Sequence, residues 1–136
     1  MKKIIFILTG LLFPVVLLAQ NVGIGTTTPG AKLEVSGFTK LGSTAPAVQM
    51  KKLTGTTPAA ANSGVSIVHG LTVSKIIAVN LIINNATNQW MPGGNTLFPG
   101  YEVNWDLGTT HINIWTNTNS ANILSKPFTV LLTYEP

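Results

Sequence analysis

The feature that most constrains the fold is a ten-residue run, KIIAVNLIIN at positions 75–84, which would carry apolar side chains on both faces of a strand. Positions 77, 79, 81 and 83 are all apolar, and so are three of the four positions that alternate with them. A strand that is apolar on both faces is usually buried on both faces. In a small antiparallel sandwich one face packs on the second sheet, so we expect a partner subunit to cover the other.

The residues after position 19 favour strands and turns. Thr, Asn, Val, Ile and Gly dominate there, whereas the helix-favouring Glu, Lys and Gln are scarce. Short strands are expected at 22–25, 32–35, 38–41, 48–53, 65–69, 75–84 and 128–134, with a hairpin before the last. We therefore predict an all-β fold class: a short N-terminal β-arm, intertwined in an oligomer, and then a small antiparallel β-sandwich. The expected arm or collar spans 20–53, the linker 54–64 and the sandwich 65–136.

Positions 1–19 have the three parts of a secretory signal peptide: Lys2 and Lys3, an uncharged apolar run, and the small Ala19 at the cleavage position. The run is shorter than the roughly 20 residues that span a bilayer, and Gly10 and Pro14 interrupt it. An uncleaved anchor is the alternative. We expect a secreted or cell-surface protein, with the periplasm as the other compartment, and no stable membrane span after cleavage.

Charge and cysteine content narrow the partners. Two of the eight lysines lie in the leader, which leaves six lysines against four acidic residues and a net charge of +2. The chain has no arginine, so nucleic acid is not an expected partner. It also has no cysteine, which excludes both a lipoprotein anchor and the disulfides that small exported domains usually need. A homo-oligomer is the remaining common way to bury more surface.

The clearest local prediction is a hairpin. Gly108-Thr109 fits a type II′ turn with glycine first, which would place Asp106 opposite His111. The resulting register puts apolar residues on one face. The other face collects Glu102, Asn104, Asp106, His111, Asn113 and Trp115.

That polar hairpin face is the main candidate binding site. Asp106 and His111 would form a charge-assisted pair, Asn104 and Asn113 would donate and accept hydrogen bonds, and Trp115 would offer a flat apolar surface. The combination is typical of sugar binding, in which an aromatic ring stacks on C–H groups while amides and carboxylates bind hydroxyls. The alternatives are a plain solvated face and a subunit interface that buries the tryptophan.

Two other positions carry weaker signals. Trp90 lies in the loop that follows the long strand, where it would either contact a ligand or, with Met91, cover the core. His69 ends the strand at 65–69 before a glycine, and its expected role is structural.

Neither a catalytic centre nor a metal or cofactor site is expected. His111 and Asp106 could join a serine in a triad, but no G-x-S-x-G pattern supports one. The sequence has no H-x-H, H-E-x-x-H or Asp-rich calcium loop. Glu102, Asn104 and Asp106 alternate along one strand at about 6.6 Å, too far apart to share one ion unless a loop closes over it.

Two stretches resemble known families. NVGIGTTTPGAKLEVSG, at 21–37, resembles a short motif at the start of many exported Bacteroidetes proteins and shaft segments of phage tail fibres, where it forms an interwoven trimeric β collar or shaft. VSIVHGLTVSKIIAV, YEVNW and KPFTVLLTYEP are similar to the β-sandwich tip domains of such fibres and, more faintly, to H-type lectins, which are trimeric sandwiches. The resemblance implies a homotrimer with a fibre-like arm and a head that binds a glycan or protein receptor. It brings no catalytic residues.

The expected function is therefore adhesion or recognition by an exported trimer, through its C-terminal head. A purely structural subunit of an extracellular or fibre assembly, without a ligand of its own, is the competing hypothesis. A small hydrolase or lyase is the third.

Overall fold

The computed structural model describes residues 21–85 and 89–136, so the expected signal peptide at 1–19 lies outside the described residues. Those residues are divided between two compact units, the first ending at Gly37 and the second spanning Phe38–Pro136. Their regular elements are β-strands and two single-turn 3₁₀ helices, η1 (Val73–Lys75) and η2 (Ala121–Ile123). No helix in the described part of the chain is long and apolar enough to cross a membrane.

The first unit contains one pair of short parallel strands, β1 (Val22–Ile24) and β2 (Leu33–Val35). The N–H of Ser36 donates to the carbonyl of Ile24 at 2.8 Å and closes the pair. Gly25 turns the chain out of β1 with a φ of +75°, and a Cβ there would lie 2.8 Å from the carbonyl oxygen of Ser36. The close approach of the two segments therefore requires glycine at this position.

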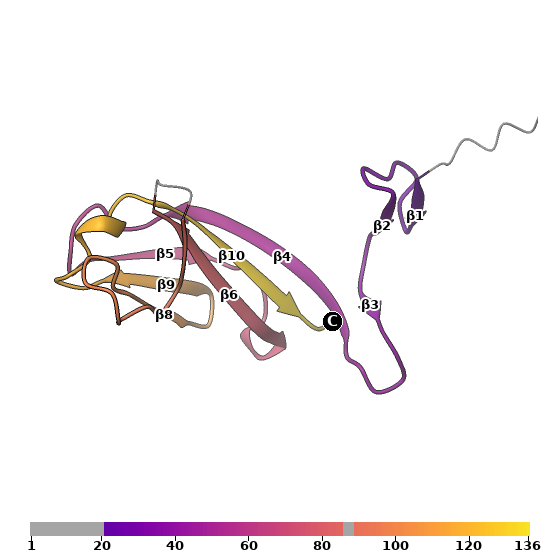
Figure 1. The fold of residues 1–136 in the computed structure, drawn as a ribbon. Helices are drawn as coiled ribbons and strands as arrows, with labels where there is room; N and C mark the ends of the chain where they lie inside the picture. Colours follow the sequence, from indigo (N-terminus) through magenta and orange to yellow (C-terminus); the bar gives the residue numbers. More distant parts are fainter. Residues whose placement is uncertain (1–20, 86–88) are drawn as a thin grey trace, which may run out of the picture. The chain divides into compact units, whose positions relative to one another are not determined.

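The second unit contains two antiparallel sheets (Figure 1). The larger has the strand order β3 (Thr39–Lys40), β4 (Ala47–Thr56), β10 (Pro127–Tyr134), β6 (Ile76–Asn84) and β7 (Trp90–Pro92). The smaller has the order β5 (Gly64–Val68), β9 (His111–Thr116) and β8 (Val103–Leu107). The predicted all-β class and the antiparallel pairing are confirmed.

The core lies between the two sheets, because alternate residues of each point inward. Its buried members are Leu81, Ile83, Val103, Ile112, Ile114, Ile123, Phe128, Val130 and Leu132. Gly55 of β4 pairs with Phe128, and a Cβ at this glycine would lie 2.5 Å from the phenyl ring. Every buried side-chain nitrogen or oxygen of the described residues has a hydrogen-bond partner.

The boundary of the N-terminal part differs from the expected one. Residues 47–53, expected in an arm, belong to β4, which pairs with the central strand β10 from Gln49 to Thr56. The expected linker at 54–64 accordingly contributes its first residues to β4, and its last residue, Gly64, begins β5. The chain leaves the larger sheet and enters the smaller one through residues 57–63.

The register of the β8–β9 hairpin differs from the predicted one by two residues. Asp106 pairs with Asn113 rather than with His111. The predicted type II′ turn is wrong, because Gly108 precedes the turn and donates its N–H to the carbonyl of His111 at 2.8 Å, without a positive φ. A shift of two residues keeps each side chain on its face, so the alternating pattern could not reveal the error.

Buried His69 fixes the position of this turn. Its backbone N–H donates to the carbonyl of Thr110 at 3.1 Å, and its ring Nε2 lies 3.2 Å from the carbonyl oxygen of Gly108. Its Nδ1 accepts the N–H of Leu71 at 3.2 Å, so Nε2 carries the proton and donates to Gly108. The strand that precedes His69 thereby determines which residues make the β8–β9 turn.

The second face of β6 lies on the outer surface of the larger sheet. Ala78 and Asn80 are exposed there and Ile82 is half-buried. Together with Leu131 of β10 and Lys52 of β4, the last two border a shallow hollow of about 250 Å³. The expected cover of this face by a partner subunit stays a prediction.

Candidate functional site

The outer face of the three-stranded sheet carries most of the predicted site. We call it the Trp115 face and define it by Gly64, Ser66, Asn104, Asp106, His111, Asn113 and Trp115. These positions alternate with inward residues of β5, β9 and β8, as the period of a strand requires. Glu102 lies directly before β8, beside the loop that follows β9.

Trp115 lies across the first residue of β5. Its partner in that strand is Gly64, and a Cβ on this glycine would lie 2.6 Å from both Cδ1 and Nε1 of the indole. The ring therefore occupies the space above a bare stretch of backbone. Trp115 remains 39% exposed, so it presents an apolar surface to solvent from a defined position.

The next row across the sheet is a chain of hydrogen bonds that ends on a carboxylate. Ser66 Oγ donates to Asn113 Oδ1 at 2.7 Å, and Asn113 Nδ2 donates to Asp106 Oδ1 at 2.7 Å. The two bonds fix which end of the Asn113 amide points to which neighbour. Three strands are thus joined by side chains on a face that solvent reaches.

A second chain of the same kind lies beside the first. Asn104 Nδ2 donates to Asn117 Oδ1 at 3.3 Å, and Asn117 Nδ2 donates to Glu102 Oε2 at 3.4 Å. The loop that supplies Asn117 is held by buried Ser120, whose Oγ donates to the carbonyl oxygen of Glu102 at 2.6 Å. This carboxylate is therefore also placed by amide donors.

The predicted pair of Asp106 and His111 is wrong. With the observed register the carboxylate receives the amide of Asn113, and His111 Nδ1 instead lies 2.7 Å from the hydroxyl oxygen of Thr110. His111 stays on the Trp115 face, one row further along the sheet. The predicted pairing of Asn104 with Asn113 is also replaced, because Asn104 lies opposite Trp115.

Two residues of this face, Gly64 and Ser66, and the bordering Asn117 were missed by the sequence reasoning. Gly64 and Ser66 lie in β5, and Asn117 lies in the loop after β9, so none belongs to the hairpin on which the prediction was built. The alternation in Gly64-Val65-Ser66-Ile67 was the available signal, since it places the glycine and the serine on one face. Their partners could not be read from it.

Trp90 is separated from the other candidates by the fold. It lies on β7, the edge strand of the larger sheet, where it pairs with Asn84 and is 54% exposed. Its neighbour Met91 is half-buried and packs against the core. Met91 therefore covers part of the core, whereas the side chain of Trp90 is exposed to solvent.

The chemistry of the Trp115 face is that of a hydrogen-bonding surface beside an aromatic ring. Together with Glu102 and Asn117 at its border, it offers two carboxylates, three amides and a hydroxyl, several already oriented by one another. Among residues 21–85 and 89–136, no group of three or more His, Cys, Asp or Glu side chains could hold a metal ion.

Comparison with known proteins adds no information on what the Trp115 face does. No family model, curated protein or solved structure matches the chain.

Proposed function

We propose that the chain is an exported recognition protein that acts as a homotrimer, and that its Trp115 face binds a glycan on another surface. The observation that carries the proposal is the indole of Trp115, which covers Gly64 and stays partly exposed beside the amide and carboxylate rows. A sugar ring needs an apolar surface for its C–H groups and placed donors and acceptors for its hydroxyls. The Trp115 face provides both within neighbouring rows.

The order of the polar rows favours selective binding over a merely solvated surface. Asn113 and Asn117 each donate to a carboxylate and accept from another side chain, so their amides are held in place before a ligand arrives. Groups that are ordered in advance lose less entropy on binding. The remaining lone pairs of Asp106 and Glu102 would accept hydroxyl groups of the ligand.

The trimer is supported by the first unit. Val22, Ile24 and Leu33 are three of the four apolar residues of its short strands, and they are 55%, 57% and 62% exposed. Two three-residue strands cannot bury such side chains by themselves. Copies of the same unit would cover them in an intertwined arm, and the resemblance of residues 21–37 to trimeric collars gives the number three.

The same exposed residues favour the competing function, a structural subunit that assembles without a ligand. The two functions differ in what the second unit does: a recognition protein keeps the Trp115 face open to a ligand, whereas in a structural subunit another copy of the chain would cover it. A binding experiment on that unit separates them.

The test is a glycan array probed with the wild-type chain and with Trp115→Ala. We expect saturable binding to a small set of glycans, weakened about tenfold or more by the loss of the ring. Val68→Ala is the matched control, because Val68 is 59% exposed on the same face of β5 and lies two rows away from Trp115. Circular dichroism checks that both variants fold.

Two results would count against the proposal. Absence of saturable binding, together with concentration-dependent assembly, would favour the structural subunit. Binding that Trp115→Ala and Val68→Ala reduce equally would remove the Trp115 face as its site.

A further inference from the structure

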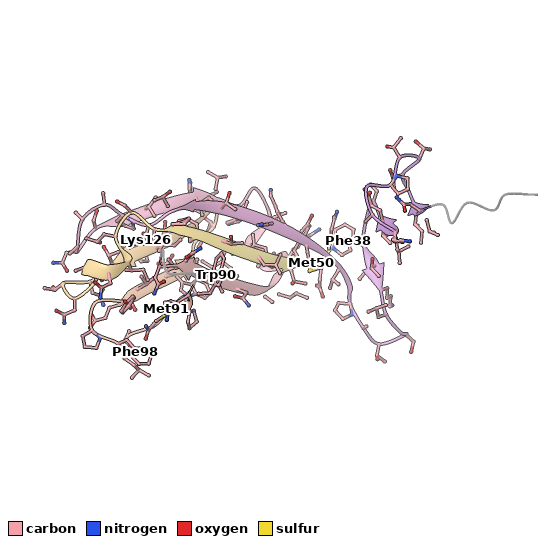
Figure 2. All side chains as sticks on the ribbon, turned by 45° about the horizontal axis from the view of Figure 1, so that its top comes forward. Phe38, Met50, Trp90, Met91, Phe98 and Lys126 are labelled. Atoms are coloured by element: carbon pink, nitrogen blue, oxygen red, sulfur yellow. The ribbon has the colours of Figure 1, made fainter. Side chains whose placement is uncertain are left out.

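We infer that a second ligand site lies beside Phe98 and takes one neutral sugar ring. The loop between β7 and β8 exposes large apolar side chains: Leu97 is 83% exposed and Phe98 is 59% exposed. Figure 2 shows Phe98 projecting from its loop at the edge of the second unit.

Hydrogen bonds fix the backbone of this loop in a conformation that leaves the side chains of Leu97 and Phe98 exposed to solvent. Buried Asn95 accepts the N–H of Leu97 on its Oδ1 at 3.1 Å, and its carbonyl accepts the N–H of Val103 at 2.9 Å. The N–H of Tyr101 donates to the carbonyl of Phe98 at 3.1 Å, which closes a turn around the exposed ring. The exposure of Leu97 and Phe98 is thus part of an ordered loop conformation.

The far end of the loop is fixed as well. The N–H of Gly100 donates to the carbonyl of Asn119 at 2.8 Å, and its φ of +92° suits glycine. A Cβ there would collide with the amide of Asn122. Both ends of the loop are therefore held by other elements of the same unit.

Two hollows share Met91 and Phe98 in their linings. One, of about 320 Å³, is bordered by Gln89, Met91, Phe98, Pro99 and Tyr101. The other, of about 450 Å³, runs along residues 91–98. The first lies at the small end of the range for ligand sites, which fits a single ring rather than an extended chain.

The lining of the smaller hollow selects for a neutral ligand. No charged side chain borders either hollow among the described residues, and the sequence from Gln89 to Tyr101 contains none. Anionic groups and membrane headgroups would find no lysine there to attract them. Met91, Phe98 and Pro99 give an apolar wall.

Two polar groups complete the site for a sugar. Gln89 accepts the amide of Asn85 on its Oε1 at 3.2 Å, which orients its Nε2 as a donor, and Tyr101 adds a phenol to the lining. An apolar wall with a few placed polar groups is typical of small-ligand sites. The inference rests on the proposed function only in that the ligand is a carbohydrate, since the Trp115 face lies on the other sheet.

Methionine methyl NMR on the full chain tests this site. The sequence has three methionines, Met1, Met50 and Met91, and Met91 borders the hollow. Met50 lies on β4, 66% exposed, and is the internal control (Figure 2). The Met50→Leu and Met91→Leu variants assign the signals. The probes are neutral methyl glycosides of glucose, galactose, mannose and N-acetylglucosamine.

We expect one or more glycosides to shift the Met91 methyl signal saturably while the Met50 signal stays in place. Phe98→Ala should weaken this binding roughly tenfold, because it removes the aromatic wall. Leu97→Ala is the matched control, since Leu97 is even more exposed in the same loop and borders only the larger hollow.

Four results would overturn the inference: no shift of Met91 with any glycoside, equal shifts of Met50 and Met91, equal weakening by Phe98→Ala and Leu97→Ala, or a Met91 shift that follows protein concentration instead of sugar. The last would mean that a second copy occupies the hollow. If the array shows Trp115-dependent binding while Met91 is silent, the proposed function stands and this site fails. If a glycoside shifts the Met91 signal while Trp115→Ala does not change binding on the array, this site stands and the Trp115 face fails as the binding site.

Discussion

At the scale of single residues, the two histidines of the chain have opposite roles. His69 is fully buried, and both of its ring nitrogens bind backbone groups, Gly108 on one side and Leu71 on the other. Its own carbonyl accepts Lys51 Nζ at 2.8 Å. His111 lies on the Trp115 face, where its ring contacts the hydroxyl of the preceding threonine.

We predict that His69→Ala lowers the free energy of unfolding by about 2–5 kcal/mol, because it leaves a cavity and two backbone groups without their buried partner. His111→Ala should change it by about 0.5 kcal/mol or less, as is usual for surface positions. Urea unfolding of the two variants and the wild type measures both values. Equal effects of the two substitutions would show that His69 does not hold the β8–β9 turn.

At the scale of elements, β10 organises the larger sheet. It pairs with β4 on one side and with β6 on the other, and its residues alternate between the core and the outer surface. Leu132 is fully buried, whereas its neighbour Leu131 is 39% exposed on the outer face. The two leucines therefore report separately on the two faces of the same strand.

Leu132→Ala should lower the free energy of unfolding by about 2–5 kcal/mol through the cavity that it creates. In a single chain Leu131→Ala should lower the free energy of unfolding by less than about 1 kcal/mol, because the side chain is only partly buried. Unfolding curves at several protein concentrations measure both. A cost for Leu131→Ala that approaches that of Leu132→Ala, and grows with concentration, would show that a partner copy covers the outer face.

The alternating patterns predicted the strands and their faces, but not the partners of individual residues. The side chains of β8 and β9 lie on the predicted faces, because alternation survives a register shift of two. The residue pairs also depend on His69, which directly follows β5 and contacts the turn. The sequence of the hairpin alone contains no sign of this contact. Likewise Ser66 and Asn113 are 47 residues apart, so their hydrogen bond follows from tertiary structure alone.

At the scale of the whole molecule, the two units differ in how they can be stable. The second unit buries a core between its sheets, whereas the first has Val22, Ile24 and Leu33 largely exposed on two short strands. Such a pair is marginal at best without further burial. The first unit is thus the part of the chain with most to gain from self-association.

We predict that the wild-type chain has three times the mass of one chain in solution, and that Ile24→Asp reduces it to that of a single chain. The charge would have to be buried among apolar neighbours in the trimer. Leu41→Asp is the control, because Leu41 is 80% exposed in the second unit and should leave the mass unchanged. Light scattering after gel filtration measures all three, and a wild-type chain of single mass would refute the trimer.

The contact between Trp115 and Gly64 also bears on how the binding face can vary among relatives. Ser66, Asn113 and Asp106 point away from the core, so evolution could replace them, and with them the ligand preference, at little cost to folding. Gly64 and Trp115 lack that independence, because any side chain added to the glycine meets the indole. These two positions should vary together or not at all. Relatives that keep both residues would then be expected to share the same binding mode.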